Sequence, residues 1–331
     1  MKAITYDRFG GPEVLALRDV TGREPGRREL VVRVRAAAMN PVDWKIRAGA
    51  MTFVAGRKFP KRSGVDFSGV VEACGPGVVG LKPGDPVLGH TSAMDHTQGS
   101  FAETCVTRAE QVLRKPARLS DVEAAAAPIA GLSALQSLRH CKVGAGKNVM
   151  LIGASGGVGT FAIQIAKALG AHVTAVCGSH GVDLCAKLGA DIVIDRAQEN
   201  PLHSRRIYDA VLDLAPAHSF SACRHLLSSS GSYLSTLPSA AGVWSQTWTT
   251  LFGSQHVRML ILKPSAGDLK ELGTMLAAGS VTPSISRLFS FSEAGVREMH
   301  RVAQEGHVLG KLAVEMAGQA VGGLRPRPCF D

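Results

Sequence analysis

Hydrophobic residues follow two different patterns along the chain. Up to about residue 115, short apolar runs such as residues 30–35 and 69–73 alternate with glycine- and proline-rich turn signals such as residues 75–77 and 82–86. Apolar runs of this length between turns are typical of β-strands. The first part of the chain therefore predicts a β-rich domain.

From about residue 119 the pattern changes to helices alternating with strands. Ser120 stands before Asp121 and Glu123, a residue order that favours a capped helix with an acidic first turn. The apolar run 149–152 is typical of a strand buried on both faces. Helical patterns follow at 158–169 and 184–188, and further strands are predicted at 172–176, 191–195, 208–213, 232–237 and 257–262. This alternation predicts a doubly wound parallel sheet.

The last 60 or so residues again look mixed. The run Lys311-Leu312-Ala313-Val314-Glu315-Met316 predicts a final strand. Because the β-rich N-terminal half looks incomplete alone, we expect this strand to return to the first domain.

A glycine-rich segment joins the strand at 149–152 to the helix that follows it. It reads Gly153-Ala154-Ser155-Gly156-Gly157-Val158-Gly159, which from Ala154 matches G-x-G-x-x-G with alanine for the first glycine. Gly156 allows a pyrophosphate to approach the backbone, Gly159 allows close helix–strand packing, and the helix N-terminus offers free N–H groups. We predict a dinucleotide site with contacts from Ser155, Gly156, Gly157, Val158 and Gly159. The alternative is a tight turn that holds no ligand.

The residues after the second strand of this domain bear on which dinucleotide is bound. An NAD site usually carries an acidic residue there, whereas this chain reads Cys177-Gly178-Ser179-His180. Ser179 can hydrogen-bond a phosphate, and Arg196 after the third strand can add a fixed cation. These two residues favour NADPH over NADH, although Arg196 also fits a solvated surface position.

Composition narrows the function classes. The 331 residues are 45% hydrophobic and 19% charged, which excludes a disordered chain. The net charge of +10 leaves nucleic acid, anionic substrates and phosphate-bearing cofactors open. Without a basic helix or a stacking surface, we expect no nucleic-acid partner.

The sequence also lacks a membrane-spanning run and an N-terminal leader pattern, and we expect a cytoplasmic protein. Its seven scattered cysteines contain no C-x-x-C pair, so we expect no disulfide framework.

Several separate motifs carry a resemblance to a known family that covers nearly the whole chain. In chain order they are residues 40–47, 64–71, 99–103, 130–135, 154–159, 188–191 and 310–312. With these motifs the chain resembles the zinc-independent quinone oxidoreductases of the medium-chain dehydrogenase/reductase superfamily. The resemblance implies a Rossmann domain, residues 121–266, inserted into a partly open, GroES-like β-barrel catalytic domain formed by residues 1–120 and 267–331.

The same resemblance argues against a metal. The zinc-dependent relatives carry cysteine where Asn40 lies and Gly-His-Glu where Gly64-Val65-Asp66 lies, and the segment 90–99 is short and free of cysteine. We therefore expect no metal site. Without a Lewis acid, alcohol oxidation is disfavoured and a conjugated, already electrophilic acceptor is favoured.

By resemblance, the expected catalytic residues are Asn40, Lys45, Asp66 and Ser133, and further cofactor contacts come from Leu237 and Lys311. Each of the four has a simpler interpretation. Asn40 fits a turn cap, Ser133 a helix serine bonded to its own backbone, Lys45 a surface lysine, and Asp66, like Asp43, a residue that positions its neighbours. Some quinone oxidoreductases have tyrosine where Lys45 lies, so we expect the final proton to come from water.

We thus predict an NADPH-dependent oxidoreductase that transfers hydride to a quinone or to the C=C bond of an α,β-unsaturated carbonyl compound. The basic segment 57–62 leaves open an enoyl-thioester reductase, unless it is a solvated loop. A third alternative is an NADPH-binding sensor without turnover. The resemblance further implies a homodimer joined through the edge strand 257–262.

Overall fold

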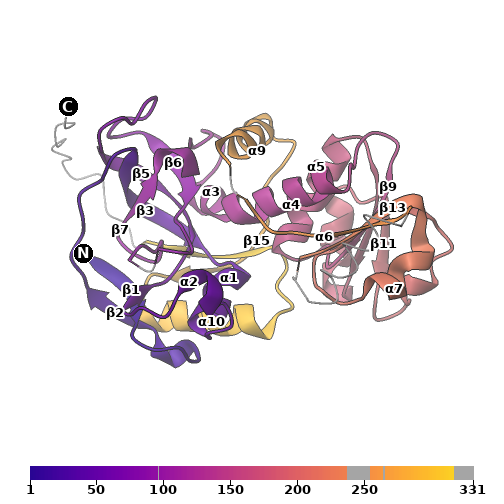
Figure 1. Cartoon of the computed structure of the whole chain (residues 1–331), viewed down its shortest axis with the longest axis horizontal. Helices are drawn as coiled ribbons and strands as arrows, with labels where there is room; N and C mark the ends of the chain where they lie inside the picture. Colours follow the sequence, from indigo (N-terminus) through magenta and orange to yellow (C-terminus); the bar gives the residue numbers. More distant parts are fainter. Residues whose placement is uncertain (96, 237–253, 264, 317–331) are drawn as a thin grey trace. The chain divides into compact units, whose positions relative to one another are not determined.

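The computed structural model describes residues 1–95, 97–236, 254–263 and 265–316. It divides into two compact units, each with its own sheet system. The first unit holds Met1–Ile129, Pro264–Ala277 and the chain from Ile285 onward, and the second holds Ala130–Lys263 and Ala278–Ser284. The second unit is therefore an insertion in the first (Figure 1).

The first unit is built on two sheets. In its larger sheet the strand order is β15-β16-β3-β5-β6-β8, and β7 also pairs with β3. In the smaller sheet the order is β2-β1-β4. The strands span Lys2–Tyr6 (β1), Ala16–Asp19 (β2), Glu29–Ala38 (β3), Lys61–Arg62 (β4), Asp66–Cys74 (β5), Pro86–His90 (β6), Thr104–Arg108 (β7), Val112–Arg114 (β8), Ile285–Ser290 (β15) and Lys311–Glu315 (β16).

Strand β3 is the centre of this unit because it pairs with three other strands. Leu30, Val32 and Val34 alternate toward the core, where they join Phe67 and Val71 of β5. The helices around these sheets are short, apart from α9 and α10. They span Pro41–Arg47 (α1), Thr52–Ala55 (α2), Asp121–Ala126 (α3), Ala266–Ala278 (α9) and Glu293–Glu305 (α10), with 3₁₀ turns at Pro12–Val14 (η1) and Ala109–Gln111 (η2).

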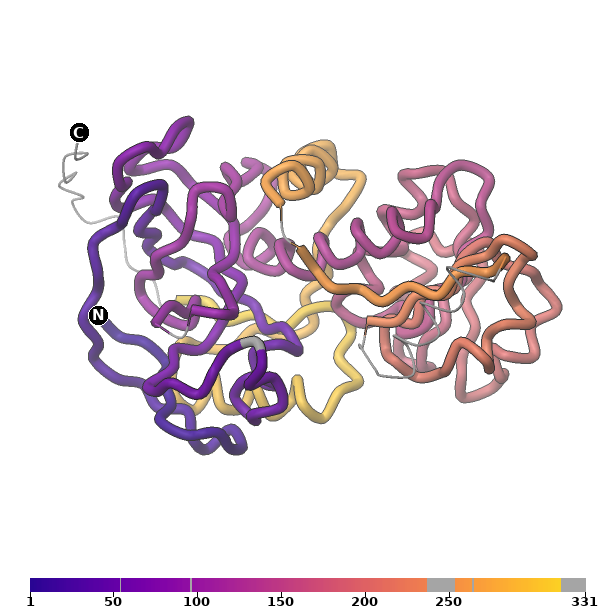
Figure 2. The backbone as a smooth tube through the Cα atoms, viewed as in Figure 1, coloured from indigo at the N-terminus to yellow at the C-terminus, as the bar shows by residue number. Residues whose placement is uncertain are grey.

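The predicted return of the last strand is confirmed. Strand β16 pairs antiparallel with β3, with Ala313 opposite Ala38, and parallel with β15. Figure 2 shows this yellow C-terminal segment running back among the indigo and purple strands of the first unit. The N-terminal half needs this strand because β5 covers only one edge of β3 along residues 36–38, and β7 pairs with the other edge only at residues 29–33.

The second unit confirms the doubly wound parallel sheet. Its strand order is β11-β10-β9-β12-β13-β14, and every pairing is parallel. The order reverses at β9, and the carboxyl ends of strands at such a point form the usual ligand crevice of this fold. The strands span Asn148–Ile152 (β9), His172–Cys177 (β10), Ile192–Asp195 (β11), Tyr208–Asp213 (β12), Leu227–Ser235 (β13) and His256–Met259 (β14).

The helices of this unit connect its strands. They span Pro128–His140 (α4), Gly157–Ala168 (α5), Val182–Lys187 (α6) and Phe220–Cys223 (α7), with 3₁₀ turns at Ser179–Gly181 (η3), Pro201–His203 (η4) and Arg224–Leu226 (η5). Helix α5 ends as the sequence predicts, because Gly170 with φ of +80° stops it.

The first boundary of the insertion lies later than the expected residue 121. Ser120 caps α3 as predicted, since its hydroxyl accepts the Glu123 N–H at 3.2 Å. However, α3 packs its Ala125 and Ala126 against Ala36, Ala38 and Ala313 of the first unit. Small side chains on both faces permit this close packing, so α3 belongs to the first unit.

The core of the first unit gives a stability prediction. Phe67 is fully buried in β5, whereas Phe53 in α2 is 83% exposed. Phe67→Ala should destabilise the protein by about 3–5 kcal/mol, and Phe53→Ala by less than about 0.5 kcal/mol. Thermal unfolding followed by circular dichroism measures both. Equal losses of stability would show that the core is not centred on β3 and β5.

Candidate functional site

Four polar side chains are buried together in the first unit, and none is more than 4% exposed. Asn40 precedes α1, Asp43 lies in its first turn, Asp66 begins β5 and Lys311 begins β16. We call them the buried polar cluster. Three of them, Asn40, Asp66 and Lys311, were predicted site residues.

The ammonium of Lys311 lies at the centre of the cluster. Its Nζ donates hydrogen bonds to Asn40 Oδ1 at 2.6 Å and to the Met39 carbonyl at 2.7 Å. Asp66 Oδ2 lies 3.8 Å from the same nitrogen. The Asn40 carboxamide has a second contact at its nitrogen end, where Nδ2 donates to Asp66 Oδ2 at 2.9 Å. The Asn40 carboxamide is thus held at both ends, with one Nδ2–H left over.

The two carboxylates also organise the backbone. Asp66 accepts the Ile129 N–H at 3.2 and 3.3 Å. Asp43 Oδ2 accepts the Asn40 N–H at 2.7 Å, which closes the first turn of α1. Asp43 Oδ1 is buried and has no hydrogen-bond partner among the described residues. The backbone at Asn40 is therefore fixed by Asp43, and its side chain by Lys311 and Asp66.

Burial dominates the electrostatics of the cluster. It raises the pKa of Asp43 to about 7, and the nearby Asp66 charge adds to the rise, while the Asn40 N–H and Lys311 oppose it. Burial also raises the pKa of Asp66 to about 6, against the opposing effects of Lys311, Asn40 and the Ile129 N–H. The pKa of Lys311 is lowered by burial and supported by both carboxylates. Burial thus shifts the protonation of both carboxyls toward neutral pH.

A small cavity of about 20 Å³ adjoins Asp43. This volume holds about one water molecule. Tyr6, Lys61 and Ser63 line it on the buried side, and the partly exposed Ser92 and Asp95 line it as well. The cavity thus extends from a buried carboxylate toward the loop after β6.

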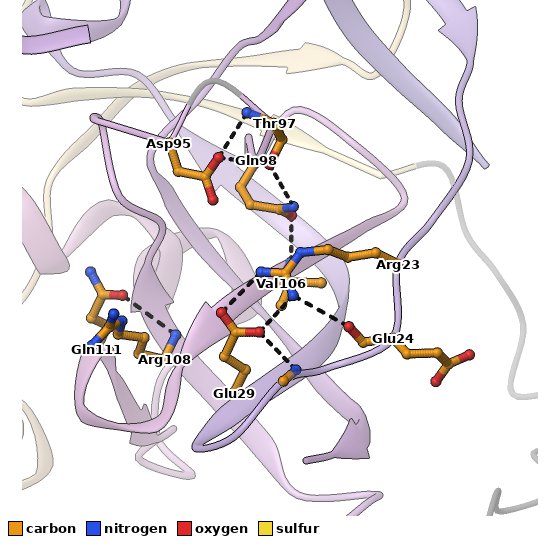
Figure 3. Close-up of polar contacts among 10 residues, drawn as sticks. Arg23, Glu24, Glu29, Asp95, Thr97, Gln98, Val106, Arg108 and Gln111 are labelled. Carbon is orange, nitrogen blue, oxygen red and sulfur yellow. Dashed lines mark hydrogen bonds and ion pairs between the residues drawn. The ribbon is translucent and has the colours of Figure 1, made fainter.

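That loop is held by its own polar contacts (Figure 3). Asp95 Oδ1 accepts the Thr97 N–H at 2.9 Å and its hydroxyl at 2.6 Å. Gln98 Oε1 accepts the Val106 N–H at 3.0 Å, which ties the loop to β7. The wall of the cavity is therefore an ordered part of the first unit.

The basic segment 57–62 does not form one cationic surface. Lys61 is only 1% exposed and its Nζ donates to the Ala55 carbonyl at 2.7 Å. Arg62 donates from Nη2 to the Thr21 carbonyl at 2.8 Å. Arg57 and Lys58 are the exposed cations that remain. This arrangement favours the structural interpretation of the segment over an anion site.

The second unit holds the glycine loop between β9 and α5 as the sequence predicts. Ser155, Gly156, Gly157 and Val158 are partly exposed, and the N–H groups of the first helical turn lack intrahelical acceptors. A Cβ at Gly159 would lie 2.5 Å from the carbonyl oxygens of Gly153 and Ala154. The loop can fold this closely onto its helix only with glycine at 159, which leaves a backbone surface suited to phosphate.

Ser179 and Arg196 come together beside this loop, at the carboxyl ends of β10 and β11. The Arg196 N–H bonds the Cys177 carbonyl at 2.9 Å. A Cβ placed on Gly178 would lie 3.8 Å from Arg196 Nε. Gly181, just after Ser179, packs against Ser155 of the glycine loop, where a Cβ would lie 2.5 Å from Ser155 Cβ. The structure thus joins three predicted cofactor contacts into one surface.

Two features of this region escaped the sequence analysis. Asp195 accepts the Ser179 hydroxyl, together with the Ala197 N–H at 3.0 Å, and these bonds lower its pKa. Its position at the end of the predicted third strand was the available signal. In the first unit, Tyr6 lies in none of the motifs, and only the pairing of β1 with β4 places it opposite Lys61, beside the cavity.

Lys45 and Ser133 make none of the hydrogen bonds of the buried polar cluster. Lys45 is half-buried on α1, with Nζ 5.7 Å from the centre of the Trp44 ring. Ser133 is 7% exposed and lies in α4, in the second unit. Leu237 falls outside the described residues.

The residues present do not fit a catalytic zinc. Among the described residues, no group of three His, Cys, Asp or Glu side chains could hold a metal ion. Asn40 Oδ1 and Asp66 already face the Lys311 ammonium, which would repel a second cation, and Asp43 Oδ1 is the single oxygen of the cluster without a partner among the described residues, too few for a zinc ion. A separate finding concerns the membrane. No helix among the described residues combines the length and the apolar composition that a membrane-spanning segment needs.

Comparisons with known proteins agree with this architecture. Residues 26–117 match the alcohol dehydrogenase GroES-like domain, and residues 188–314 match the zinc-binding dehydrogenase family. The chloroplast envelope quinone oxidoreductase homolog of Arabidopsis thaliana is 33% identical over 329 residues, which cover 95% of this chain and 98% of the relative.

Two further matches extend the comparison. The 2-methylene-furan-3-one reductase of Solanum lycopersicum is 37% identical over 220 residues, 64% of this chain and 56% of the relative. The structure of the quinone oxidoreductase from Coxiella burnetii has a TM-score of 0.87 at 31% identity and covers 95% of this chain and 99% of its own.

The buried polar cluster predicts a pH effect on stability. Asp43 has a pKa of about 7 in the folded chain, above the ~3.9 of an unfolded aspartate. The folded chain therefore binds a proton that the unfolded chain releases, and stability falls as pH rises from about 4 to about 7. Asp66, Lys311 and Tyr6 are the charged or titratable groups that interact with Asp43.

Asp43→Asn should remove much of this loss, because the amide oxygen still accepts the Asn40 N–H and carries no charge. Thermal unfolding at about pH 5 and about pH 8 measures it. The variant should gain stability relative to the wild type at the higher pH. A difference between the two proteins that is the same at both pH values would contradict the role given to Asp43.

Proposed function

The chain belongs to the quinone oxidoreductase family of the medium-chain dehydrogenase/reductase superfamily, and we propose that it uses NADPH, without zinc, to reduce quinones or α,β-unsaturated carbonyl compounds. One observation supports this proposal: the glycine loop lies against the segment of Ser179, which in turn lies beside Arg196, at the crevice of the parallel sheet where a phosphate would bind. Quinone and enone reduction also match the names of the Arabidopsis and tomato relatives.

The second unit binds the cofactor. Ser155 to Gly159 offer backbone N–H groups and the positive end of α5 to the pyrophosphate. NADPH, when bound, supplies the hydride. The described residues bind and orient the cofactor, as proteins usually do for a nicotinamide cofactor that carries the hydride.

Preference for NADPH over NADH rests on Arg196 and Ser179. Both are exposed at the ends of adjacent strands, so an extra phosphate on the ribose can reach them. Arg196 supplies a permanent, planar cation. Asp195 accepts hydrogen bonds from Ala197, Gln198 and Ser179. The Ser179 hydroxyl would have to turn from Asp195 to donate to the phosphate, so Arg196 carries most of the preference.

The first unit provides the polar chemistry for the substrate. We assign the remaining Nδ2–H of Asn40 to the substrate oxygen, where negative charge develops when hydride adds to a quinone or to a β-carbon. The Lys311 ammonium bonds the oxygen of the same amide and makes the amide a stronger donor. A water molecule then protonates the product, since no tyrosine lies in α1, where Lys45 stands.

Zinc independence follows from the same cluster in this proposal. Lys311 already supplies a positive charge beside Asn40 and Asp66, so a metal is not needed to polarise the amide, and Asp43 Oδ1 alone would not hold one. An enoyl-thioester reductase is a weaker alternative, because the basic segment 57–62 leaves only Arg57 and Lys58 exposed. A sensor without turnover would not need the oriented hydrogen-bond donor that the buried polar cluster provides.

We further propose a homodimer formed through β14, the strand at one edge of the parallel sheet. Ile261, just after it, is 60% exposed, and pairing would cover this apolar edge. A cytoplasmic location, and a partner set limited to small molecules without nucleic acid or membrane, remain our predictions for this chain.

The proposed activity is tested directly by following NADPH oxidation by absorbance with a panel of quinones, enones and enoyl-CoA thioesters. We expect quinones or enones to accelerate oxidation, and chelator treatment to leave the rate unchanged. NADPH binding with no accelerated oxidation by any acceptor would support the sensor instead. Loss of activity on chelation, restored by zinc, would overturn the metal-free proposal.

Cofactor choice gives a second prediction. Arg196→Gln should raise the KM for NADPH by about 10- to 100-fold, the value of a hydrogen bond to a charged group, and leave NADH kinetics nearly unchanged. Arg205→Gln is the matched control, an exposed arginine after η4 with no part in the cofactor surface. Equal kinetic changes for NADPH and NADH in Arg196→Gln would remove this residue from phosphate recognition.

A further inference from the structure

Lys311 is expected by resemblance to contact the cofactor, but its hydrogen bonds lie elsewhere. The side chain is 3% exposed. Its Nζ donates hydrogen bonds to the Met39 carbonyl at 2.7 Å and to Asn40 Oδ1 at 2.6 Å, and Asp66 Oδ2 lies at the ion-pair distance of 3.8 Å. An ammonium group has three donors. Two of them are used within the first unit and the positive charge is paired with Asp66, so the group is stabilised there without a phosphate.

These contacts select one orientation of the Asn40 amide. A carboxamide can rotate by half a turn and exchange its oxygen and nitrogen with little change of shape. In the rotated state, the NH₂ group of Asn40 would face the Lys311 ammonium and its oxygen would face the Asp66 carboxylate. Both contacts would be repulsive in a buried site where charges are poorly screened. Only the observed orientation is compatible with the two charges.

The orientation has a chemical consequence. One Nδ2–H of Asn40 is used by Asp66, and the second has no acceptor among the contacts of the described residues. Its direction is set because the oxygen of the amide is bonded to Lys311. A donor whose direction is fixed in advance stabilises a developing oxyanion without reorganisation during the reaction.

We propose that Lys311 and Asp66 are positioning residues that fix the Asn40 carboxamide as a hydrogen-bond donor to the substrate oxygen, and that Lys311 makes no contact with the cofactor. This inference rests on the proposed reductase function. It replaces the expectation that Lys311 binds NADPH, and it gives Asp66 a role through Asn40 instead of direct chemistry.

A double-mutant cycle on Asn40 and Lys311 tests the proposal. Asn40→Ala should lower kcat by about 100-fold or more, the usual cost of losing one oxyanion donor. Lys311→Met should lower kcat in the same direction but leave the Kd of NADPH, measured by fluorescence without acceptor, unchanged. In the Asn40→Ala background, Lys311→Met should cause little further loss of kcat, because Lys311 acts through Asn40.

Two results would contradict the proposal. A tenfold rise in the Kd of NADPH for Lys311→Met would show that this lysine binds the cofactor. Full additivity of the two kcat losses would show that Lys311 acts independently of Asn40. If the wild type reduces no acceptor, the proposed function fails, and the Kd measurement still decides whether Lys311 contacts NADPH.

Two further variants separate positioning from folding. Lys311→Met leaves Asp66 as a buried carboxylate without its cation, so the paired variant Asp66→Asn/Lys311→Met removes both charges and should recover thermal stability but not kcat. Lys115→Met is the matched control, because Lys115 is a partly buried lysine of the first unit that bonds the Leu119 carbonyl at 2.8 Å and pairs with Asp121, outside the buried polar cluster. It should lose stability and keep kcat, whereas an equal loss of kcat would indicate a general folding defect.

Discussion

The buried ammonium of Lys311 ties together segments that are far apart in the chain. It bonds Met39 and Asn40, which lie 272 and 271 residues earlier, at the junction of β3 and α1. Removing an ammonium from water is costly unless carbonyl and carboxylate oxygens surround it. The first unit meets this requirement only when β16 lies beside β3 and Asp66 begins β5. The ion, the order of the strands and the position of Asn40 therefore depend on one another.

This dependence links fold to chemistry. The same strand pairing that completes the sheet brings a cation to an amide oxygen, and the amide N–H on the other side becomes a stronger and better-directed donor. Asp43 adds a carboxyl group whose pKa is raised to about 7 by burial, next to a cavity large enough for one water molecule. The first unit thus holds an oriented hydrogen-bond donor, the Asn40 amide, and a carboxyl group with a raised pKa, that of Asp43. The second unit holds a surface suited to phosphate.

Much of this could be predicted from the sequence because the relevant signals are local. The apolar run 149–152, the glycine loop and Gly170 specify the strand, turn and helix within about 25 residues, and the second unit follows that pattern. The return of the strand at 311–316 could be predicted because the β-rich N-terminal half looks incomplete without a further strand, which β16 supplies. Ser179 and Arg196 converge because parallel strands bring their carboxyl ends to one edge.

What escaped prediction depends on pairing across long sequence distances. No local pattern shows that Lys311 bonds Asn40, that Tyr6 lies opposite Lys61, or that Lys61 points inward from a basic segment. The start of the insertion was also misplaced, since the alanines of α3 match both a helix of the second unit and the alanine face of β3.

NMR of ¹⁵N-labelled lysine side chains directly observes whether the Lys311 ammonium holds the Asn40 amide. We expect an ammonium signal that is lost in Lys311→Met, exchanges slowly with water even at mildly alkaline pH, and shifts in Asn40→Ala. A Lys311 signal in fast exchange with water, unchanged by Asn40→Ala, would show that the ammonium is free and does not hold the Asn40 amide.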